Sequence, residues 1–260
     1  MSMRSRSTVW RLMAGRQALR LAVLGIAFAC AGFAHAWVAL DVGHNLDKPG
    51  ATSARGRTEF EFNRDLALEI ARALQAQGVE ARLINADGSI RTLTARVRAA
   101  SGAELLIAVH HDSVQPQFLT PWVHDGMERL RSGDRFSGFS LFVSRRSADL
   151  GAGLRCASAI GAGLIEDGFN PSLYHAEPVP GEFKPFADRT NGVHYFDNLV
   201  VLKEATMPAL LLEAGVIVNR DEEERLLDPV RMRRMAGAIA RSIRSCLAAR
   251  RIGAARPVHF

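Results

Sequence analysis

Short apolar runs alternate with amphipathic stretches along most of the 260-residue chain. The apolar runs have the length and composition of strands and cover residues 37–42, 79–84, 103–110, 137–144, 199–205 and 208–215. A helical spacing of apolar residues marks the stretches 60–78, 92–102, 148–168 and 229–250. This alternation predicts a single α/β domain with a mainly parallel, twisted sheet flanked by helices.

Two stretches, 115–137 and 168–197, lack either spacing and are rich in proline, glycine, histidine and aromatic residues. We expect both to be loops, and loops of this length in a compact domain usually carry a function or move. The segment 169–198 directly precedes a predicted strand, and we predict that it forms a flap beside the site. Its polar and aromatic side chains either line a substrate groove or belong to a solvated loop: Tyr174, His175, Arg189 and His194.

The first 36 residues have the layout of a secretory signal peptide. A basic head precedes an apolar run, which ends in the small-x-small sequence Ala34-His35-Ala36. We predict cleavage after Ala36, export of residues 37–260 as the mature domain, and a periplasmic or secreted location. A retained membrane anchor is the alternative, because the apolar run is near the lower length limit of a span.

Export changes how charge and cysteines are interpreted. The net charge of the whole chain is +6, but its first 36 residues hold five arginines and no acid. The remainder is therefore nearly neutral, and no nucleic-acid partner is expected. The mature chain keeps Cys156 and Cys246, both inside predicted helices. An oxidising compartment permits a bridge between them, but we interpret them as two small buried residues.

Residues with metal-binding chemistry lie at or just beyond the carboxyl ends of three predicted strands. The first strand runs into His44, the third into His110 and His111, and the last into Glu213. In open α/β sheets, sites lie outside the carboxyl ends of the strands. Neutral imidazoles and carboxylates are ligands of zinc, and a catalytic zinc ion has three protein ligands and an open water position. The pattern therefore predicts a zinc site at the carboxyl edge of the sheet.

Several other catalytic classes lack support in the sequence. It contains no His-Glu-x-x-His helix, no Gly-x-x-x-x-Gly-Lys phosphate loop and no Gly-x-Ser-x-Gly elbow. Neither mature cysteine follows a predicted strand, so a cysteine nucleophile is not expected. These absences leave metal-dependent chemistry as the best-supported interpretation.

Four blocks of the chain resemble, in the same order, the signature blocks of the zinc-dependent N-acetylmuramoyl-L-alanine amidases of the Amidase_3 type. The blocks are VALDVGHNLDKPGA, TEFEFNRDLALEIARAL, LLIAVHHDS and FDNLVVLKEATMPALLLEAGVIVN, and the resemblance spans roughly residues 37–248. It implies that His44, Glu59 and His110 bind Zn²⁺ and that Glu213 is the catalytic residue. It also implies that residues 37–260 form a zinc amidase domain.

Two pairs of neighbouring residues compete for these roles. Glu61 lies inside the start of the predicted helix, where an acid also complements the positive helix end. Glu59 stands on the incoming loop and is freer to turn toward the sheet edge. Consecutive strand residues face opposite sides of a sheet, so His110 and His111 cannot both reach the metal. The third block of the family has a small residue after its histidine, and we predict that His111 is a substrate contact or a surface residue.

The resemblance also implies a reaction. In this reaction Glu213 takes a proton from a zinc-activated water, and the resulting hydroxide attacks an amide carbonyl. Glu213 then passes the proton to the leaving nitrogen. The amide is the one between N-acetylmuramic acid and L-alanine in peptidoglycan. Asp41 and Asp112 are candidates to orient the ligand imidazoles through hydrogen bonds.

Other features stay open at the level of the sequence. The loop after the first strand departs from the family pattern, with Asn45-Leu46 in place of a second glycine and Lys48 inside the usual Asp-Pro-Gly run. A zinc peptidase or amidase acting on another amide, such as a carboxypeptidase-like enzyme, is one alternative. A non-catalytic cell-wall-binding module is another. We expect a monomer that binds peptidoglycan, and the need for a protein activator is left open.

Overall fold

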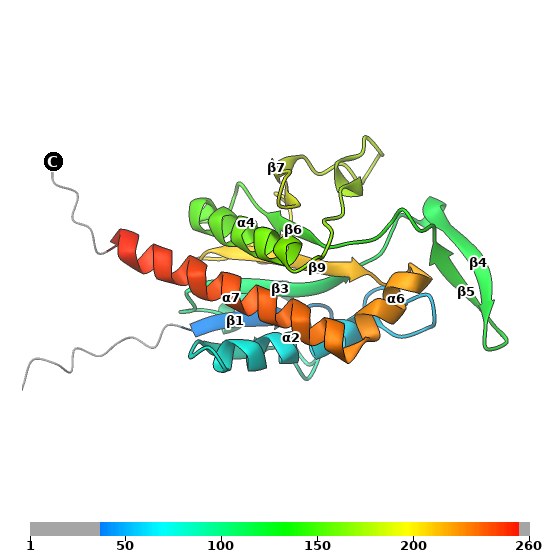
Figure 1. The fold of residues 1–260 in the computed structure, drawn as a ribbon, viewed down its shortest axis with the longest axis horizontal. Helices are drawn as coiled ribbons and strands as arrows, with labels where there is room; N and C mark the ends of the chain where they lie inside the picture. Colours follow the sequence, from blue (N-terminus) through cyan, green and yellow to red (C-terminus); the bar gives the residue numbers. More distant parts are fainter. Residues whose placement is uncertain (1–36, 255–260) are drawn as a thin grey trace, which may run out of the picture. The chain divides into compact units, whose positions relative to one another are not determined.

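A seven-stranded sheet forms the centre of the computed structural model, which describes residues 37–254 (Figure 1). The predicted signal peptide, residues 1–36, lies outside the described residues. The strands of the sheet are β1 (Trp37–Val42), β2 (Glu80–Ile84), β3 (Leu105–Asp112), β6 (Ser140–Val143), β7 (Phe186–Asp188), β8 (Val193–Tyr195) and β9 (Ala209–Val216). The helices are α2 (Glu59–Gln75), α3 (Leu93–Ala99), α4 (Leu150–Glu166), α5 (Val200–Lys203), α6 (Arg220–Leu227) and α7 (Pro229–Ala254).

The order of the strands across the sheet is β2-β1-β3-β9-β6-β8-β7. Strands β2, β1, β3 and β9 run parallel to one another, whereas β6 pairs antiparallel with β9. Strand β8 is parallel to β6, and β7 is antiparallel to β8. The prediction of an α/β domain with a mainly parallel sheet flanked by helices is confirmed. The carboxyl ends of β1, β3 and β9 consequently meet at one edge.

Alternate residues of each central strand face two separate cores. On β3, Leu105, Ile107 and Val109 belong to the core shared with α2, α4 and α7. Leu106 and Ala108 belong to the core on the other face, which includes residues of α3 and α5. Burial of both faces explains why the central strands read as continuous apolar runs rather than as alternating ones. It also fixes the side to which each residue beyond Val109 points.

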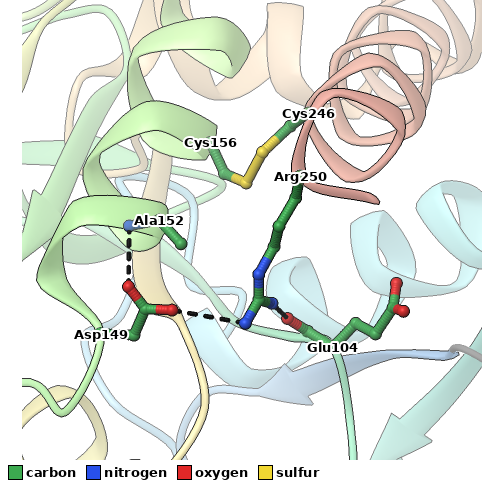
Figure 2. Close-up of a disulfide and its surroundings, with 6 residues drawn as sticks. All are labelled: Glu104, Asp149, Ala152, Cys156, Cys246 and Arg250. Atoms are coloured by element: carbon green, nitrogen blue, oxygen red, sulfur yellow. Dashed lines mark hydrogen bonds and ion pairs between the residues drawn. A yellow bond between two sulfur atoms is a disulfide. The ribbon is translucent and has the colours of Figure 1, made fainter. Parts of the chain in front are cut away.

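A disulfide joins α4 to α7, which pack against each other (Figure 2). It links Cys156 to Cys246, whose Cα atoms are 5.4 Å apart and whose sequence separation is 90 residues. The interpretation of the two cysteines as separate buried residues is wrong, because the packing of the two helices brings them together. Nearby, Arg250 of α7 donates hydrogen bonds to the carbonyl oxygen of Glu104 and to the carboxylate of Asp149 (Figure 2).

The predicted strand at 199–205 is a helical turn instead. Residues Val200–Lys203 form α5, with Val201 and Leu202 buried against the α3 side of the sheet. A run of only a few apolar residues has no periodicity that separates a strand from a buried helical turn. The neighbouring prediction at 208–215 is confirmed by β9.

The first predicted loop, 115–137, contains a β-hairpin. A short 3₁₀ turn, Pro116–Phe118, leads into β4 (Leu119–His124), which pairs with β5 (Met127–Ser132). The two residues between the strands, Asp125 and Gly126, have positive φ angles of 50° and 72°. Asp-Gly is a strong sequence signal for such a two-residue turn, so this hairpin was predictable. It lies outside the main sheet, beyond α6 in Figure 1.

The second predicted loop, 168–197, is also partly regular. It contains the 3₁₀ turn Tyr174–Ala176 and the short strands β7 and β8 at the edge of the main sheet. Between residues 37 and 254, no helix is long and apolar enough to cross a membrane.

Candidate active site

Three side chains with metal-binding chemistry converge at the carboxyl edge of the sheet: His44 after β1, Glu59 at the start of α2, and His110 in β3. One potential ligand atom from each lies within 4.8 Å of the others. The Glu59 carboxylate stands between the two imidazoles, 2.9 Å from Nε2 of His44 and 3.0 Å from Nδ1 of His110. We call this group the metal cluster. The predicted convergence is confirmed, and metal binding itself remains a prediction.

Glu59 is the first residue of α2 rather than a loop residue, so its expected location was wrong by one position. Its neighbour Glu61 accepts hydrogen bonds from the backbone N–H and hydroxyl of Thr58, at 3.0 and 2.6 Å. Those bonds satisfy the helix start and keep Glu61 away from the sheet edge. The carboxylate of Glu59 instead turns back and accepts the backbone N–H of Ala51 at 3.2 Å.

The protonation of the metal cluster suits cation binding. Burial by itself would raise the pKa of Glu59, but hydrogen bonds with His110 and His44 outweigh it and hold that pKa far below its usual range. Burial lowers the pKa of His110 below its ordinary 6.5, more strongly than Glu59 raises it. An ionised carboxylate and a neutral imidazole are the forms that coordinate a metal ion.

Two glycines make room for this cluster. A Cβ atom at Gly43 would stand 2.4 Å from Nε2 of His110. A Cβ at Gly50, whose φ is +82°, would stand 2.4 Å from Oε2 of Glu59. Both distances are impossible for real contacts, so only glycine allows the two side chains to take these positions. The glycines of the first sequence block are therefore packing requirements of the site.

His44 itself has a left-handed backbone conformation, with φ of 66°, which is uncommon for a non-glycine residue. Two buried side chains hold the turn. Asn85 donates to the carbonyl oxygens of Val42 and His44 at 2.9 and 2.7 Å. Arg96 donates to the same two carbonyls, at 2.9 Å for Val42. Sequence patterns missed both residues, since a lone arginine in a helix is usually solvent-exposed.

The two aspartates expected to orient the imidazoles do not do so. Asp41 is fully buried, and neither of its carboxylate oxygens has a hydrogen-bond partner among the described residues. Burial raises its pKa to about 7, although the guanidinium of Arg96 lies 3.7 Å away and opposes that rise. Asp112 instead accepts a hydrogen bond from the Tyr174 hydroxyl and pairs with Nε2 of His175 at 2.8 Å.

His111 points to the opposite face from His110, as the strand geometry predicted, but it is neither a surface residue nor a substrate contact. Its side chain is buried under α2, where Nδ1 lies 2.9 Å from Oδ1 of Asn63 and the ring packs on Phe62. Burial lowers its pKa to about 3. His111 continues the alternation of Leu105, Ile107 and Val109 along β3. Its imidazole therefore points toward the same core as those three side chains.

Glu213 lies in β9 beside His110 of β3, to which it is register-paired. Immediately beyond this pair β9 advances three residues while β3 advances two, so the ladder is irregular here. The Oε2 atom of Glu213 is buried and has no hydrogen-bond partner within residues 37–254. Burial raises the pKa of Glu213 well above its usual range, and the negative charges of Asp112 and Glu59 add to that effect.

A second cluster at this edge comes from the segment 172–184. His175 lies between two carboxylates, with Nε2 2.8 Å from Asp112 and Nδ1 2.5 Å from Glu182. We call Asp112, His175 and Glu182 the tether cluster, because it binds the segment to β3. Burial alone would lower the pKa of His175, but Asp112 and Glu182 together raise it to about 9.

The expectation of a solvated loop is therefore wrong for three of its polar residues. Tyr174, His175 and His194 are all buried. His194 donates through Nδ1 to the carbonyl oxygen of Lys184 at 3.0 Å. Arg189, by contrast, is exposed and stacks on Phe186.

Known proteins with related sequences identify the family. The family profile described as N-acetylmuramoyl-L-alanine amidase (Amidase_3) matches residues 38–245. This chain belongs to that family. The chain is 28% identical over 219 residues to N-acetylmuramoyl-L-alanine amidase AmiA of Salmonella typhimurium, which covers 79% of this chain and 74% of the relative. The same values hold for AmiA of Escherichia coli.

Solved structures of the family share the fold. The amidase from Clostridium difficile 630 superposes with a TM-score of 0.64 at 21% identity, covering 83% of this chain and 98% of that one. The catalytic domain of CwlV from Bacillus (Paenibacillus) polymyxa var. colistinus gives 0.60 at 26% identity, covering 82% and 98%. The assignment makes this chain a peptidoglycan amidase, and the matched region contains both the metal cluster and Glu213.

Proposed function

We propose that this chain is an exported, zinc-dependent enzyme that hydrolyses the amide between N-acetylmuramic acid and L-alanine of the peptidoglycan stem peptide. Membership of the amidase family supports the substrate class. The observation that carries the zinc-dependent mechanism is the convergence of His44, Glu59 and His110 beside Glu213 at one edge of the sheet.

The residues of the metal cluster fit a zinc ion. Two imidazole nitrogens and one carboxylate oxygen make the three-ligand set of many catalytic zinc sites, which leaves a position open for water. Their close approach depends on Gly43 and Gly50, which any side chain would disrupt. A zinc ion bound there would act as a Lewis acid, polarising the amide carbonyl and acidifying a water molecule.

Glu213 has the properties of the proton carrier in this reaction. It lies beside His110 of the metal cluster, and its carboxylate would take a proton from the attacking water. Its Oε2 atom, buried and without a hydrogen-bond partner among residues 37–254, is free to hold that proton. Glu213 would then donate the proton to the leaving nitrogen, which departs as the free amine of L-alanine. Asp112 is hydrogen-bonded to Tyr174 and His175, so it is not available as the proton carrier.

Export is supported by two independent features. The layout of residues 1–36 is that of a signal peptide. The Cys156–Cys246 disulfide is of a kind that persists in oxidising compartments and is rare in reducing ones. Sequencing the amino terminus of the protein recovered from its native host tests the proposal, with Trp37 expected as the first residue.

Digestion of purified sacculi tests the reaction. We expect the zinc-loaded protein to release free stem peptides that begin with L-alanine, identified by mass spectrometry, while chelator-treated protein releases none. Readdition of zinc should restore the release. Fragments cut inside the stem would point to a peptidase, and intact sacculi with the protein bound would point to a wall-binding module.

A further inference from the structure

His111 directly follows His110, a proposed zinc ligand, and its side chain points to the opposite face of β3. We propose that His111 is a positioning residue: it fixes the orientation of the Asn63 side-chain amide, and through Asn63 it fixes the carboxylate of Glu59. The proposal rests on the zinc site proposed above and adds to it a support on the opposite face of β3.

Asn63 connects the two sides. Its Nδ2 atom donates to Oε1 of Glu59 at 3.2 Å and to the carbonyl oxygen of Gly43 at 3.3 Å. Both N–H groups of the amide are therefore used by acceptors. Its Oδ1 atom faces Nδ1 of His111 at 2.9 Å. Since Oδ1 can only accept, Nδ1 of His111 must carry the proton and donate it.

The partners of Asn63 agree on one of two amide orientations. Rotated by half a turn, Asn63 would present Oδ1 to the Glu59 carboxylate and to the Gly43 carbonyl, and acceptors would face each other in both contacts. In the observed orientation, the N–H group of His111 is the donor that satisfies Oδ1. His111 therefore holds the amide in the orientation that donates to Glu59.

The side chains of His111, Asn63 and Glu59 are shielded from water, so the loss of any hydrogen bond between them is costly. Asn63 is fully buried, and His111 and Glu59 are 4% and 5% exposed. Polar groups left without partners in such surroundings are costly, and hydrogen bonds there are strong.

The Glu59 carboxylate is held at both oxygens. Asn63 donates to Oε1, and the backbone N–H of Ala51 donates to Oε2. These two donors set the plane of the carboxylate between His44 and His110. Loss of the Asn63 bond would leave that plane to rotate. Partners of this kind commonly change metal affinity by about ten- to a hundredfold.

The test compares zinc dissociation constants, measured by chelator competition on the purified mature protein. His111→Phe keeps an aromatic ring against Phe62 but removes the donor. We expect it to weaken zinc binding about tenfold. Asn63→Ala should weaken it by a similar factor, and the double variant should be little worse than Asn63→Ala alone, because both changes remove one connection.

His194→Phe is the matched control, since it removes another buried imidazole, whose hydrogen bond goes to the carbonyl oxygen of Lys184 and not to the metal cluster. It should leave zinc affinity unchanged while lowering the melting temperature of the metal-free protein. If His111→Phe also lowers only the melting temperature, or if the effects of His111→Phe and Asn63→Ala multiply, the positioning role is wrong. Should His111→Phe not fold, His111→Ala is measured and interpreted in the same way.

Failure of the underlying zinc site has a different signature. In that case the wild-type protein binds no zinc, or His110→Ala binds it as tightly as the wild type does. Both results are independent of any change at His111.

Discussion

Two clusters at the same edge of the sheet use the same residue types in opposite proportions. The metal cluster has one carboxylate, Glu59, between two imidazoles. The tether cluster has one imidazole, His175, between two carboxylates. The difference decides what each can do.

The number of neighbouring carboxylates sets the pKa of His110 and of His175 apart. In the metal cluster a single negative charge does not compensate for burial, and the pKa of His110 falls below 6.5. In the tether cluster two negative charges overcome burial and raise the pKa of His175 to about 9. A protonated imidazole has no lone pair for a metal ion, whereas a neutral one has. The first cluster is therefore suited to a cation and the second to holding the chain.

Zinc retention gives the sharpest test of this contrast. We expect His110→Ala and His44→Ala to lose their zinc completely on dialysis, because each removes one of the three proposed ligands. His175→Ala, in the other cluster, should retain one zinc per chain. Metal content is measured by plasma emission spectroscopy. Zinc lost from His175→Ala but kept by His110→Ala would reverse the assignment of the two clusters.

The carboxylates of both clusters contribute to the raised pKa of Glu213. We expect Glu213→Gln to lower the rate of stem-peptide release by about a hundred- to ten-thousandfold, the usual contribution of a general base. Zinc content and melting temperature should stay near those of the wild type. Near-normal turnover would move the proton carrier elsewhere, and lost zinc would make Glu213 a ligand.

The tether cluster should make stability depend on pH. The folded pKa of His175 lies above its unfolded value, so its stabilising effect is complete below about pH 6.5 and is lost as the pH rises through about 9. A shift from 6.5 to about 9 corresponds to roughly 3 to 4 kcal/mol at most. Denaturant unfolding near pH 6 and pH 9.5 measures the loss, and the higher value is kept below the titration of Tyr174, whose own pKa is raised.

The matching control for the pH experiment is His175→Gln, which should be less stable near pH 6 and nearly insensitive to the same change in pH. Equal losses of stability in the wild type and in this variant would show that His175 is not the group responsible.

The smallest expected effect concerns turnover. Glu182→Gln removes one charge of the tether cluster, so the segment 172–184 should open more often. Hydrogen exchange should accelerate at the amide of Lys184, which donates to the carbonyl of His175. Turnover of sacculi should change several-fold, and should fall if the segment lines the substrate groove.

Glu177→Gln is the control for that segment. It breaks only an exposed ion pair with Arg135, and exposed pairs contribute little. Hydrogen exchange and turnover should then stay at wild-type values. Unchanged turnover in Glu182→Gln despite faster exchange would limit the tether to a structural role.

The fold was largely predictable because its signals are local and repeated. Burial on both faces makes the central strands continuous apolar runs, and amphipathic spacing marks α2, α4 and α7. The errors have local causes too. The turn at α5 is too short to show a period, and the hairpin is marked only by the two-residue turn Asp125-Gly126, without the apolar alternation of a buried strand.

The residues of the candidate site were predictable where they lie at strand ends or within the sequence blocks that resemble the family. His44, His110 and Glu213 follow from the rule that carboxyl ends of parallel strands share an edge. Choosing Glu59 over Glu61 needed the resemblance, since both residues lie in the first turn of α2. Asn85 and Arg96 carried no signal, because their role is to bind carbonyl oxygens that only the folded chain brings near.

The sequence by itself determined the α/β class, the edge that carries the site, and the fact that His110 and His111 face opposite ways. These three features depend on periodic burial and on strand direction, and both can be inferred from residues that are neighbours in the sequence. Only the tertiary structure decided the Cys156–Cys246 pairing, the partners of Asp112, and the contact of His111 with Asn63. Those contacts join elements far apart in the chain, and they depend on how helices and loops pack on the sheet, which local periodicity does not encode.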